Sequence, residues 1–354
     1  MSAKNSSALR RKLLRWYEKN KRDLPWRKTD DPYAIWIAET MLQQTQVKTV
    51  LPYYDRFLKA FPNVDALARA PRERILRLWS GLGYYRRAEN LRSAARHLIR
   101  RNRGKIPRDY DKLRALQGIG DYTAGAILSI AFQQRYPAVD GNVRRVLSRL
   151  FCLTDQTELR ARAAQLVPRS RPGDFNQALM ELGATLCAPR LPNCAACPVY
   201  SECAARQSAD FGRLPLSRKK HNFKDVTWPL AIVRRRGKIL LRRRTATGIL
   251  AGLWELPGGE IVKRERPEIA LRRELHDSVG SLPAPRRIGE LRHSITYRRI
   301  RAPLYFFDCP SPARIRLPGT NWRWATTSEL DDFPMSSMAR KALRVFDLHE
   351  KNLS

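Results

Sequence analysis

Four of the six cysteines in this 354-residue chain crowd into residues 187–203, at Cys187, Cys194, Cys197 and Cys203. A secreted disulfide scaffold would spread its cysteines along the chain and need an export signal, but residues 1–10 lack the apolar segment of a signal peptide. A tight cluster in an intracellular protein is typical of metal binding. Four thiolates spaced C-x6-C-x2-C-x5-C suit either zinc or an iron–sulfur cluster, and their chemistry alone leaves that choice open.

The chain changes character after this cluster. Before it, helix-length amphipathic segments are broken by Pro and Gly, and four of them are expected near residues 31–42, 72–79, 123–132 and 142–151. After it, a polar basic stretch precedes four segments with the pattern of strands, at 228–233, 238–241, 294–300 and 302–307. One helix is expected near 267–278. We therefore expect an all-α domain over residues 1–216, a basic linker at 217–226 and an α+β domain over 227–354.

The formal net charge of +35 predicts a polyanionic partner. The excess of Arg over Lys suits bidentate contacts to phosphate. The alternative is an ordinary solvated surface whose Arg content reflects codon bias. Such bias exchanges Lys for Arg more easily than it creates a surplus of positive charge. With no run of 18 apolar residues to cross a membrane, we expect a cytoplasmic protein associated with the bacterial nucleoid.

The segment LQGIGDYTAG at residues 116–125 carries the first strong signal for binding. Gly118 and Gly120 let the backbone turn tightly, and the helix that follows would offer free amide groups to a phosphate. This pattern is typical of a helix–hairpin–helix element that binds DNA without reading sequence. The alternative is an ordinary tight turn between two helices.

Two carboxylates in the first domain have structural and functional interpretations. Asp140 follows a short apolar stretch and precedes a helix, so the residues alone favour an N-cap. Glu39 lies among apolar residues of a predicted helix, either as an exposed side chain or as a partly buried acid with a raised pKa. Spacing does not decide between these.

Five segments occur in a fixed order: WIAETMLQQTQV at 36–47, GLGYY at 81–85, the Gly118 hairpin, VDGN at 139–142 and the cysteine cluster. Together they closely resemble the MutY adenine glycosylases of the endonuclease III superfamily, over nearly all of residues 8–205. The resemblance implies that Glu39 protonates adenine at N7 and that Asp140 stabilises the developing sugar cation. Cleaving an N-glycosidic bond needs such a pair, an acid for the leaving group and an anion beside an oxocarbenium-like sugar.

The resemblance also assigns contacts to a flipped adenine and its partner base. It places Gln44 and Tyr84 in the duplex, although the residues alone favour a surface glutamine and a core aromatic. It places Arg27 in the adenine pocket and Asn142 near the sugar. Bifunctional relatives carry a lysine where this chain has Tyr122, and because a phenol cannot form an imine, Tyr122 predicts a glycosylase without strong strand-nicking activity.

The resemblance assigns a [4Fe–4S] cluster to Cys187, Cys194, Cys197 and Cys203, in a loop over residues 187–203. Arg190, between the first two ligands, would lie on the outer face of this loop and contact phosphate, or would simply be exposed.

The second domain follows the Nudix box G-x5-E-x7-R-E-U-x-E-E-x-G-U. The matching residues are Gly259, Glu265, Arg273, Glu274, Leu275 and Gly280. The two glutamates that should follow Leu275 are replaced by Asp277 and Ser278, so one magnesium ligand is lost. MutY proteins carry a Nudix-like domain of this kind as a reader of the oxidised guanine, which is the interpretation we favour.

MutY proteins often carry Phe-Ser-His in a loop of that domain, and the matching residues here are Ile295, Thr296 and Tyr297. We expect Thr296 to read the lesion through its hydroxyl; the alternative is an edge of a packed strand.

We therefore predict a monomeric, monofunctional glycosylase that removes adenine opposite 8-oxoguanine or guanine in double-stranded DNA. A bifunctional glycosylase-lyase is disfavoured by Tyr122, and a Nudix pyrophosphohydrolase by Ser278. A non-catalytic DNA-binding module is disfavoured because Glu39 and Asp140 both occupy their matched positions.

Overall fold

The computed structural model describes residues 3–207, 214, 222–245, 248–261, 265–279, 282–309, 317 and 319–351. The chain forms two compact units, Met1–Ala70 with Glu89–Lys220, and Pro71–Ala88 with His221–Ser354. The C-terminal unit thus includes a segment from the first hundred residues. Among the helices that the structure describes, none is both long and apolar enough to cross a membrane.

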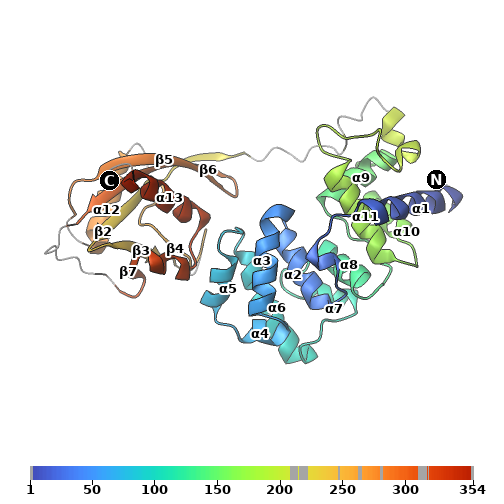
Figure 1. Cartoon of the computed structure of the whole chain (residues 1–354), viewed down its shortest axis with the longest axis horizontal. Helices are drawn as coiled ribbons and strands as arrows, with labels where there is room; N and C mark the ends of the chain where they lie inside the picture. The colour runs from blue at the N-terminus through green and yellow to red at the C-terminus, as the bar shows by residue number, and fades with distance from the viewer. Residues whose placement is uncertain are drawn as a thin grey trace. The chain divides into compact units, whose positions relative to one another are not determined.

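The N-terminal unit is helical, as predicted (Figure 1). Its helices, with those of Pro71–Ala88, are α1 (Ala3–Asn20), α2 (Pro32–Leu42), α3 (Val47–Ala60), α4 (Val64–Arg69), α5 (Arg72–Trp79), α6 (Arg86–Asn102), α7 (Tyr110–Arg114), α8 (Asp121–Ile130), α9 (Gly141–Phe151), α10 (Gln156–Leu166) and α11 (Pro172–Thr185). Short 3-10 turns lie at η1 (Pro25–Arg27), η2 (Tyr200–Glu202) and η3 (Ala204–Gln207).

Side-chain caps explain where several of these helices begin. Asp31 accepts hydrogen bonds from the backbone amides of Tyr33 and Ala34, and Pro32 takes the first position of α2, as the sequence predicts. The helix predicted over 72–79 is α5. The helix predicted over 123–132 is α8, which starts and ends two residues earlier.

Small residues let the helices that carry the predicted site pack closely. A Cβ atom on Gly183 of α11 would lie 2.7 Å from the Cβ of Asn142, at the start of α9. A Cβ atom on Gly125 of α8 would lie 2.0 Å from the carbonyl oxygen of Pro137. Because both positions exclude a larger side chain, glycine fixes the approach of α8 and α11 to the segment before and after Asp140.

The C-terminal unit is built on a mixed sheet with strand order β1-β6-β2-β3-β4, to which β5 and β7 are added beside β6 and β3. Its strands are β1 (Lys224–Thr227), β2 (Leu230–Arg235), β3 (Lys238–Arg243), β4 (Trp254–Glu255), β5 (Arg286–Ile295), β6 (Arg298–Asp308) and β7 (Trp322–Thr326). A 3-10 turn, η5, covers Ser328–Asp332. The hairpin predicted from residues 228–241 is β2–β3.

Two helices cover opposite faces of this sheet. Leu230 and Ile232 of β2 share a core with α13 (Ser337–Lys351), whereas Ala231 and Val233 share one with α12 (Pro267–Val279). The alternation follows from the two-residue period of a strand. The predicted α/β architecture is confirmed.

Two local predictions in this unit are wrong. The strand predicted over 294–300 is interrupted, because Thr296 and Tyr297 form the turn of the β5–β6 hairpin. No Gly or Asn marks this turn, and Thr296 adopts a φ of +53°, a conformation that sequence patterns do not predict for a β-branched residue. Residues 224–226 of the predicted linker belong to β1, a short parallel edge strand paired with β6; residues 217–221 lie outside the described residues.

Candidate active site

The carboxyl group of Glu39 is enclosed inside the N-terminal unit. Glu39 lies on α2, where nine consecutive residues are buried, and its own exposure is 5%. The Tyr122 hydroxyl donates a hydrogen bond to its Oε2. Burial raises the pKa of Glu39 to about 7, helped by the negative charge of Asp140 and opposed by the Tyr122 hydrogen bond and by Arg27. Of the two interpretations of Glu39, the buried acid is confirmed.

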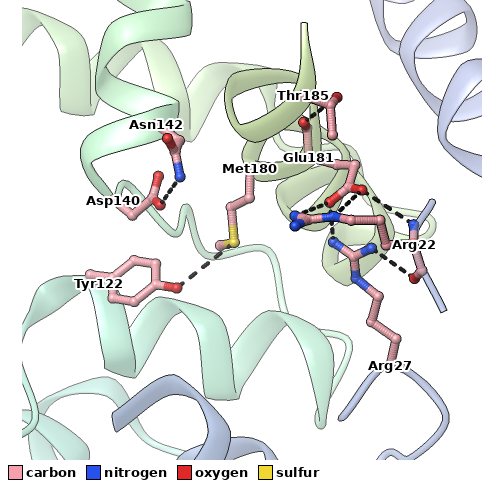
Figure 2. Close-up of polar contacts among 8 residues, drawn as sticks. All are labelled: Arg22, Arg27, Tyr122, Asp140, Asn142, Met180, Glu181 and Thr185. Atoms are coloured by element: carbon pink, nitrogen blue, oxygen red, sulfur yellow. Dashed lines mark hydrogen bonds and ion pairs between the residues drawn. The ribbon is translucent and has the colours of Figure 1, made fainter. Parts of the chain in front are cut away.

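Tyr122 reaches this carboxylate from the first turn of α8. Its hydroxyl also lies 3.8 Å from the Met180 sulfur of α11, a contact drawn in Figure 2. Burial, followed by the charges of Glu39 and Asp140, raises the pKa of the phenol well above its usual value. Tyr122 therefore stays protonated and donates.

Asp140 is the N-cap of α9, as the residues alone predict. Its Oδ1 accepts from the Val143 amide at 2.7 Å. Its Oδ2 accepts from the Asn142 side-chain amide at 3.0 Å, the contact drawn in Figure 2. Burial raises the pKa of Asp140, while these hydrogen bonds act in the opposite direction. Asp140 does more than cap the helix, because its negative charge also contributes to the raised pKa of Glu39. Two carboxyl groups with different partners thus share one site.

Asn142 is held in turn by an arginine. Arg145 donates to the Asn142 Oδ1 at 2.9 Å, to the Gly183 carbonyl at 2.6 Å and to the Cys187 carbonyl at 2.8 Å. The side chain beside Asp140 is therefore oriented by groups from α11 and from the first cysteine of the cluster.

Arg27 is anchored by Glu181, a residue that sequence reasoning missed. The Glu181 side chain is fully buried, and its Oε2 accepts from Arg27 at 2.7 Å while its Oε1 accepts from Arg22 at 2.7 Å (Figure 2). The two guanidinium groups outweigh burial and hold the pKa of Glu181 down at about 2. Its apolar neighbours Met180 and Leu182 are the same signal that singled out Glu39.

The predicted hairpin has the expected geometry. Gly118 and Gly120 are exposed, Gly118 adopts a φ of +87°, and Gly120 precedes α8 without a side-chain cap. The first turn of α8 is thus open to an anionic group. Asp121, in this first turn, forms ion pairs with Arg114 at 2.6 Å and with Arg160 at 3.0 Å.

The four clustered cysteines line one small cavity of about 30 Å³, together with mostly apolar side chains and with Arg149, Arg206 and Asn193. Arg149 donates to the Cys187 sulfur at 3.3 Å. Burial raises the pKa of Cys197 to about 11, and the other three cysteines add to this effect. Within the described residues, no group of His, Cys, Asp or Glu is already arranged to hold a metal ion. Convergence of four thiols on a single apolar cavity nevertheless fits a sulfur-ligated group.

Arg190 is exposed on this loop.

Three of the predicted DNA contacts share a backbone conformation that non-glycine residues rarely adopt. Gln44, Tyr84 and Thr296 have φ values of +57°, +47° and +53°, and all three are exposed. Such conformations are unfavourable and concentrate at functional sites. Tyr84 is 48% exposed, so the expectation of a core aromatic is wrong.

The Nudix-box residues of the C-terminal unit form ion pairs with arginines. Glu265 pairs with Arg273 at 2.9 Å, and Glu274 pairs with Arg242 of β3. Arg242 also contacts the buried Glu255 at 3.1 Å. The side chains of Asp277 and Ser278, and the whole of Gly280, lie outside the described residues.

Comparisons with known proteins agree with this arrangement. Residues 37–169 match the HhH-GPD superfamily of base excision DNA repair proteins, and residues 227–345 match the NUDIX domain. The chain is 37% identical to the adenine DNA glycosylase of Rattus norvegicus over 98% of this chain and 79% of that protein. It is 36% identical to that of Homo sapiens over 96% and 74%. The solved structure of a thermostable thymine-DNA glycosylase is 32% identical, with a TM-score of 0.55 over 57% of this chain and 96% of its own.

The buried acid, the capped second carboxylate and the appended Nudix-like unit therefore occur in a chain that belongs to the adenine DNA glycosylases, enzymes that hydrolyse N-glycosyl bonds.

Proposed function

We propose that this chain removes adenine from A:8-oxoguanine and A:G mispairs in double-stranded DNA and does not cut the strand. One observation carries the reaction: a buried carboxyl group, Glu39, has a pKa of about 7 and shares its site with a second carboxylate, Asp140. Near neutral pH, a pair of this kind can supply one proton and one negative charge.

Glu39 acts first as the acid. Its carboxyl proton passes to N7 of a flipped adenine, the bond between the sugar C1′ and N9 breaks, and the bonding electrons leave with the base. Asp140 stabilises the positive charge left on the sugar, and its bonds to Val143 and Asn142 hold it in place for this role. Water then attacks C1′ and gives a proton to the Glu39 carboxylate, which restores the acid.

Tyr122 supports the absence of strand cleavage. A lyase step needs an amine at the sugar to form an imine, but this chain presents a phenol. The Tyr122 hydroxyl donates to Glu39 and so orients the acid instead.

The charge and the exposed strained residues support duplex DNA as the partner. The net charge of +35 attracts phosphates, and the open hairpin at Gly118 and Gly120 offers amides to them. Gln44 and Tyr84 would contact the disturbed base pair, Arg27 and Asn142 the adenine nucleotide, and Thr296 the partner base. All the proposed groups come from one chain, so the enzyme acts as a monomer on chromosomal DNA at the nucleoid.

The cavity of Cys187, Cys194, Cys197 and Cys203 would hold a [4Fe–4S] cluster, which supplies a rigid anchor for the loop over 187–203. Arg190, exposed on that loop, would contact phosphate. Purified protein is expected to be yellow-brown and to contain iron; a colourless, active preparation with tightly bound zinc would contradict the cluster.

The central test is adenine release from A:8-oxoguanine, A:G and A:C duplexes, with strand scission scored before and after alkali. Release from the first two duplexes, with strand breaks appearing only after alkali, is expected. Breaks without alkali would contradict the monofunctional reaction, and lack of adenine release would contradict the proposed activity.

A further inference from the structure

The segment Pro71–Ala88 packs with the Nudix-like unit although it lies within the helical half of the sequence. Four residues, which we call the clasp, make this contact: Ser80, Tyr85, Met335 and Arg340. The Met335 carbonyl accepts from the Ser80 hydroxyl at 2.8 Å and from the Tyr85 hydroxyl at 2.9 Å. Arg340 donates to the Ser80 hydroxyl at 3.1 Å. Ser80, Tyr85 and Met335 are all buried, so these bonds are shielded from water.

The clasp is fixed on both sides. On the Nudix-like side, Met335 bridges to Trp254 of β4, and Arg340 is anchored by Asp331 at 2.7 Å. On the other side, the Tyr85 hydroxyl also accepts from the Gly81 amide at 3.2 Å and closes the loop on itself.

Two ion pairs made by α5, which precedes Ser80, extend the contact. Arg77 of α5 pairs with Asp332 at 2.9 Å, and Glu73 pairs with Arg243 of β3 at 2.6 Å. These pairs are exposed and contribute little by themselves, but they show that the contact runs along the whole of α5.

The loop held by the clasp presents Tyr84. Its ring is 48% exposed on a backbone with a φ of +47°. The Arg87 guanidinium lies 5.3 Å from the ring centre of Trp79 and 5.5 Å from that of Tyr84, so it supports the tyrosine from the side of the buried tryptophan. Separating two stacked bases costs energy, so an aromatic side chain that inserts between them needs a rigid support. A flexible loop would deform instead of separating the bases.

We propose that the clasp makes the Nudix-like unit the support of the Tyr84 loop, with Ser80, Tyr85 and Arg340 acting as positioning residues for insertion of Tyr84 into the duplex. The inference rests on the proposed DNA substrate. It assigns this unit a second task, besides reading the partner base, that depends on the Met335 carbonyl and not on Thr296.

The test uses the full-length chain and two duplexes. Fluorescence is read on a duplex with 2-aminopurine next to 8-oxoguanine, opposite an adenine analogue that cannot be hydrolysed, and adenine release is read on the same duplex with ordinary adenine. Insertion of Tyr84 unstacks the probe and raises its fluorescence, and Tyr84→Ala should abolish that rise. Tyr85→Phe and Ser80→Ala should each reduce the rise and lower single-turnover adenine release by roughly five- to thirtyfold, since each loses buried hydrogen bonds. DNA affinity should change little, and the melting temperature should fall by no more than a few degrees. If either variant fails to fold, Arg340→Lys replaces it, since lysine keeps the charge beside Asp331 but loses the fixed Nε donor.

Tyr305→Phe is the matched control. It removes a hydroxyl that donates to Glu268 at 2.6 Å in the same unit, away from the clasp, and should leave both signals unchanged. Clasp variants that behave like Tyr305→Phe, or a fluorescence rise that survives Tyr84→Ala, would overturn the inference. Glu39→Gln separates the two proposals, because it should lose adenine release and keep the fluorescence rise. A wild-type protein that raises fluorescence but releases no adenine would contradict the proposed activity and leave the clasp supported.

Discussion

Glu39 of the helical unit and Glu255 of the Nudix-like unit are both buried acids, and their surroundings differ. In the helical unit, burial raises the pKa of Glu39 to about 7, and its hydrogen-bond partner Tyr122 is a neutral phenol. In the Nudix-like unit, Arg242 contacts both Glu255 and Glu274, and Arg244 contacts Glu255 at 2.9 Å. The first arrangement leaves a carboxyl group that can give up a proton, whereas the second holds its carboxyl groups in ion pairs with arginines.

The difference separates chemistry from support. A carboxylate paired with guanidinium groups is a poor acid and is already occupied by an internal cation, which is unfavourable for Mg²⁺ binding. Pairing can outweigh burial, as at the fully buried Glu181, whose pKa falls to about 2, but at Glu255 burial outweighs the two arginines and raises the pKa. We therefore expect substitutions of Glu39 to abolish the reaction and those of the paired acids of the Nudix-like unit to spare it.

The largest effect is expected for Glu39→Gln. The amide keeps the shape of the side chain and loses the proton, so single-turnover adenine release should fall by roughly 10²- to 10⁴-fold. Binding to an A:8-oxoguanine duplex, measured by anisotropy, should remain close to wild type. Near-normal release by this variant would remove the distinction between the two units.

Asp140→Asn should lower adenine release by roughly 10²- to 10³-fold, because it removes a preorganised charge beside the sugar cation. Asparagine caps helices as well as aspartate does, so α9 should keep its start. Asp155→Asn, at the N-cap of α10, is the matched control and should retain full activity. Thermal melting of both variants checks the fold. A normally active Asp140→Asn enzyme would leave Asp140 with only its capping role.

The pH profile of adenine release should fall above about pH 7. Glu39 must be protonated to act, and its pKa is raised to about 7, so the rate should drop about tenfold per pH unit above that value. At lower pH it should level off and then fall where Asp140 takes up a proton. The Tyr122 hydrogen bond lowers the pKa of Glu39. Tyr122→Phe should therefore move the alkaline limb to higher pH; a limb that stays in place in this variant would assign it to another group.

A smaller effect is expected at the hairpin tip of the Nudix-like unit. Thr296→Val removes one hydroxyl and should reduce the preference for A:8-oxoguanine over A:G by about fivefold, the value of roughly one hydrogen bond. Thr296→Ser keeps the hydroxyl and should retain the preference. The ratio of single-turnover rates on the two duplexes is the measurement, and an unchanged ratio in Thr296→Val would exclude this residue as the reader.

The smallest effect is expected for Glu274→Gln. Because Glu274 is paired with Arg242 and takes no part in the reaction, adenine release should change by less than about twofold. A loss comparable to that of Glu39→Gln would contradict the assignment of catalysis to the helical unit.

Local signals in the sequence predicted much of the fold. Caps and apolar periodicity gave the start of α2 at Asp31 and the whole of α5, because both depend on neighbouring residues. The β5–β6 turn was missed because Thr296 is held in its unfavourable conformation by strand pairing, not by its own preference. The inclusion of Pro71–Ala88 in the C-terminal unit was missed for the same reason, since it depends on residues far along the chain.

The site was predictable in its residue types and not in its electrostatics. The resemblance to the MutY family singled out Glu39, Asp140 and Tyr122, but the raised pKa of Glu39 arises from enclosure that no spacing reveals. Glu181 was overlooked because a single glutamate in an apolar helix says nothing of the two arginines that approach from residues 22 and 27.

The clasp also has a consequence during synthesis of the chain. The Tyr85 hydroxyl and the Met335 carbonyl are separated by 250 residues. At a ribosomal rate of about 5–20 residues per second, the loop waits roughly 12–50 seconds for its partner to emerge. During that interval the buried faces of Ser80 and Tyr85 remain open to chaperones and proteases. Any gene product that stops before Met335 carries the same exposed loop for its whole lifetime.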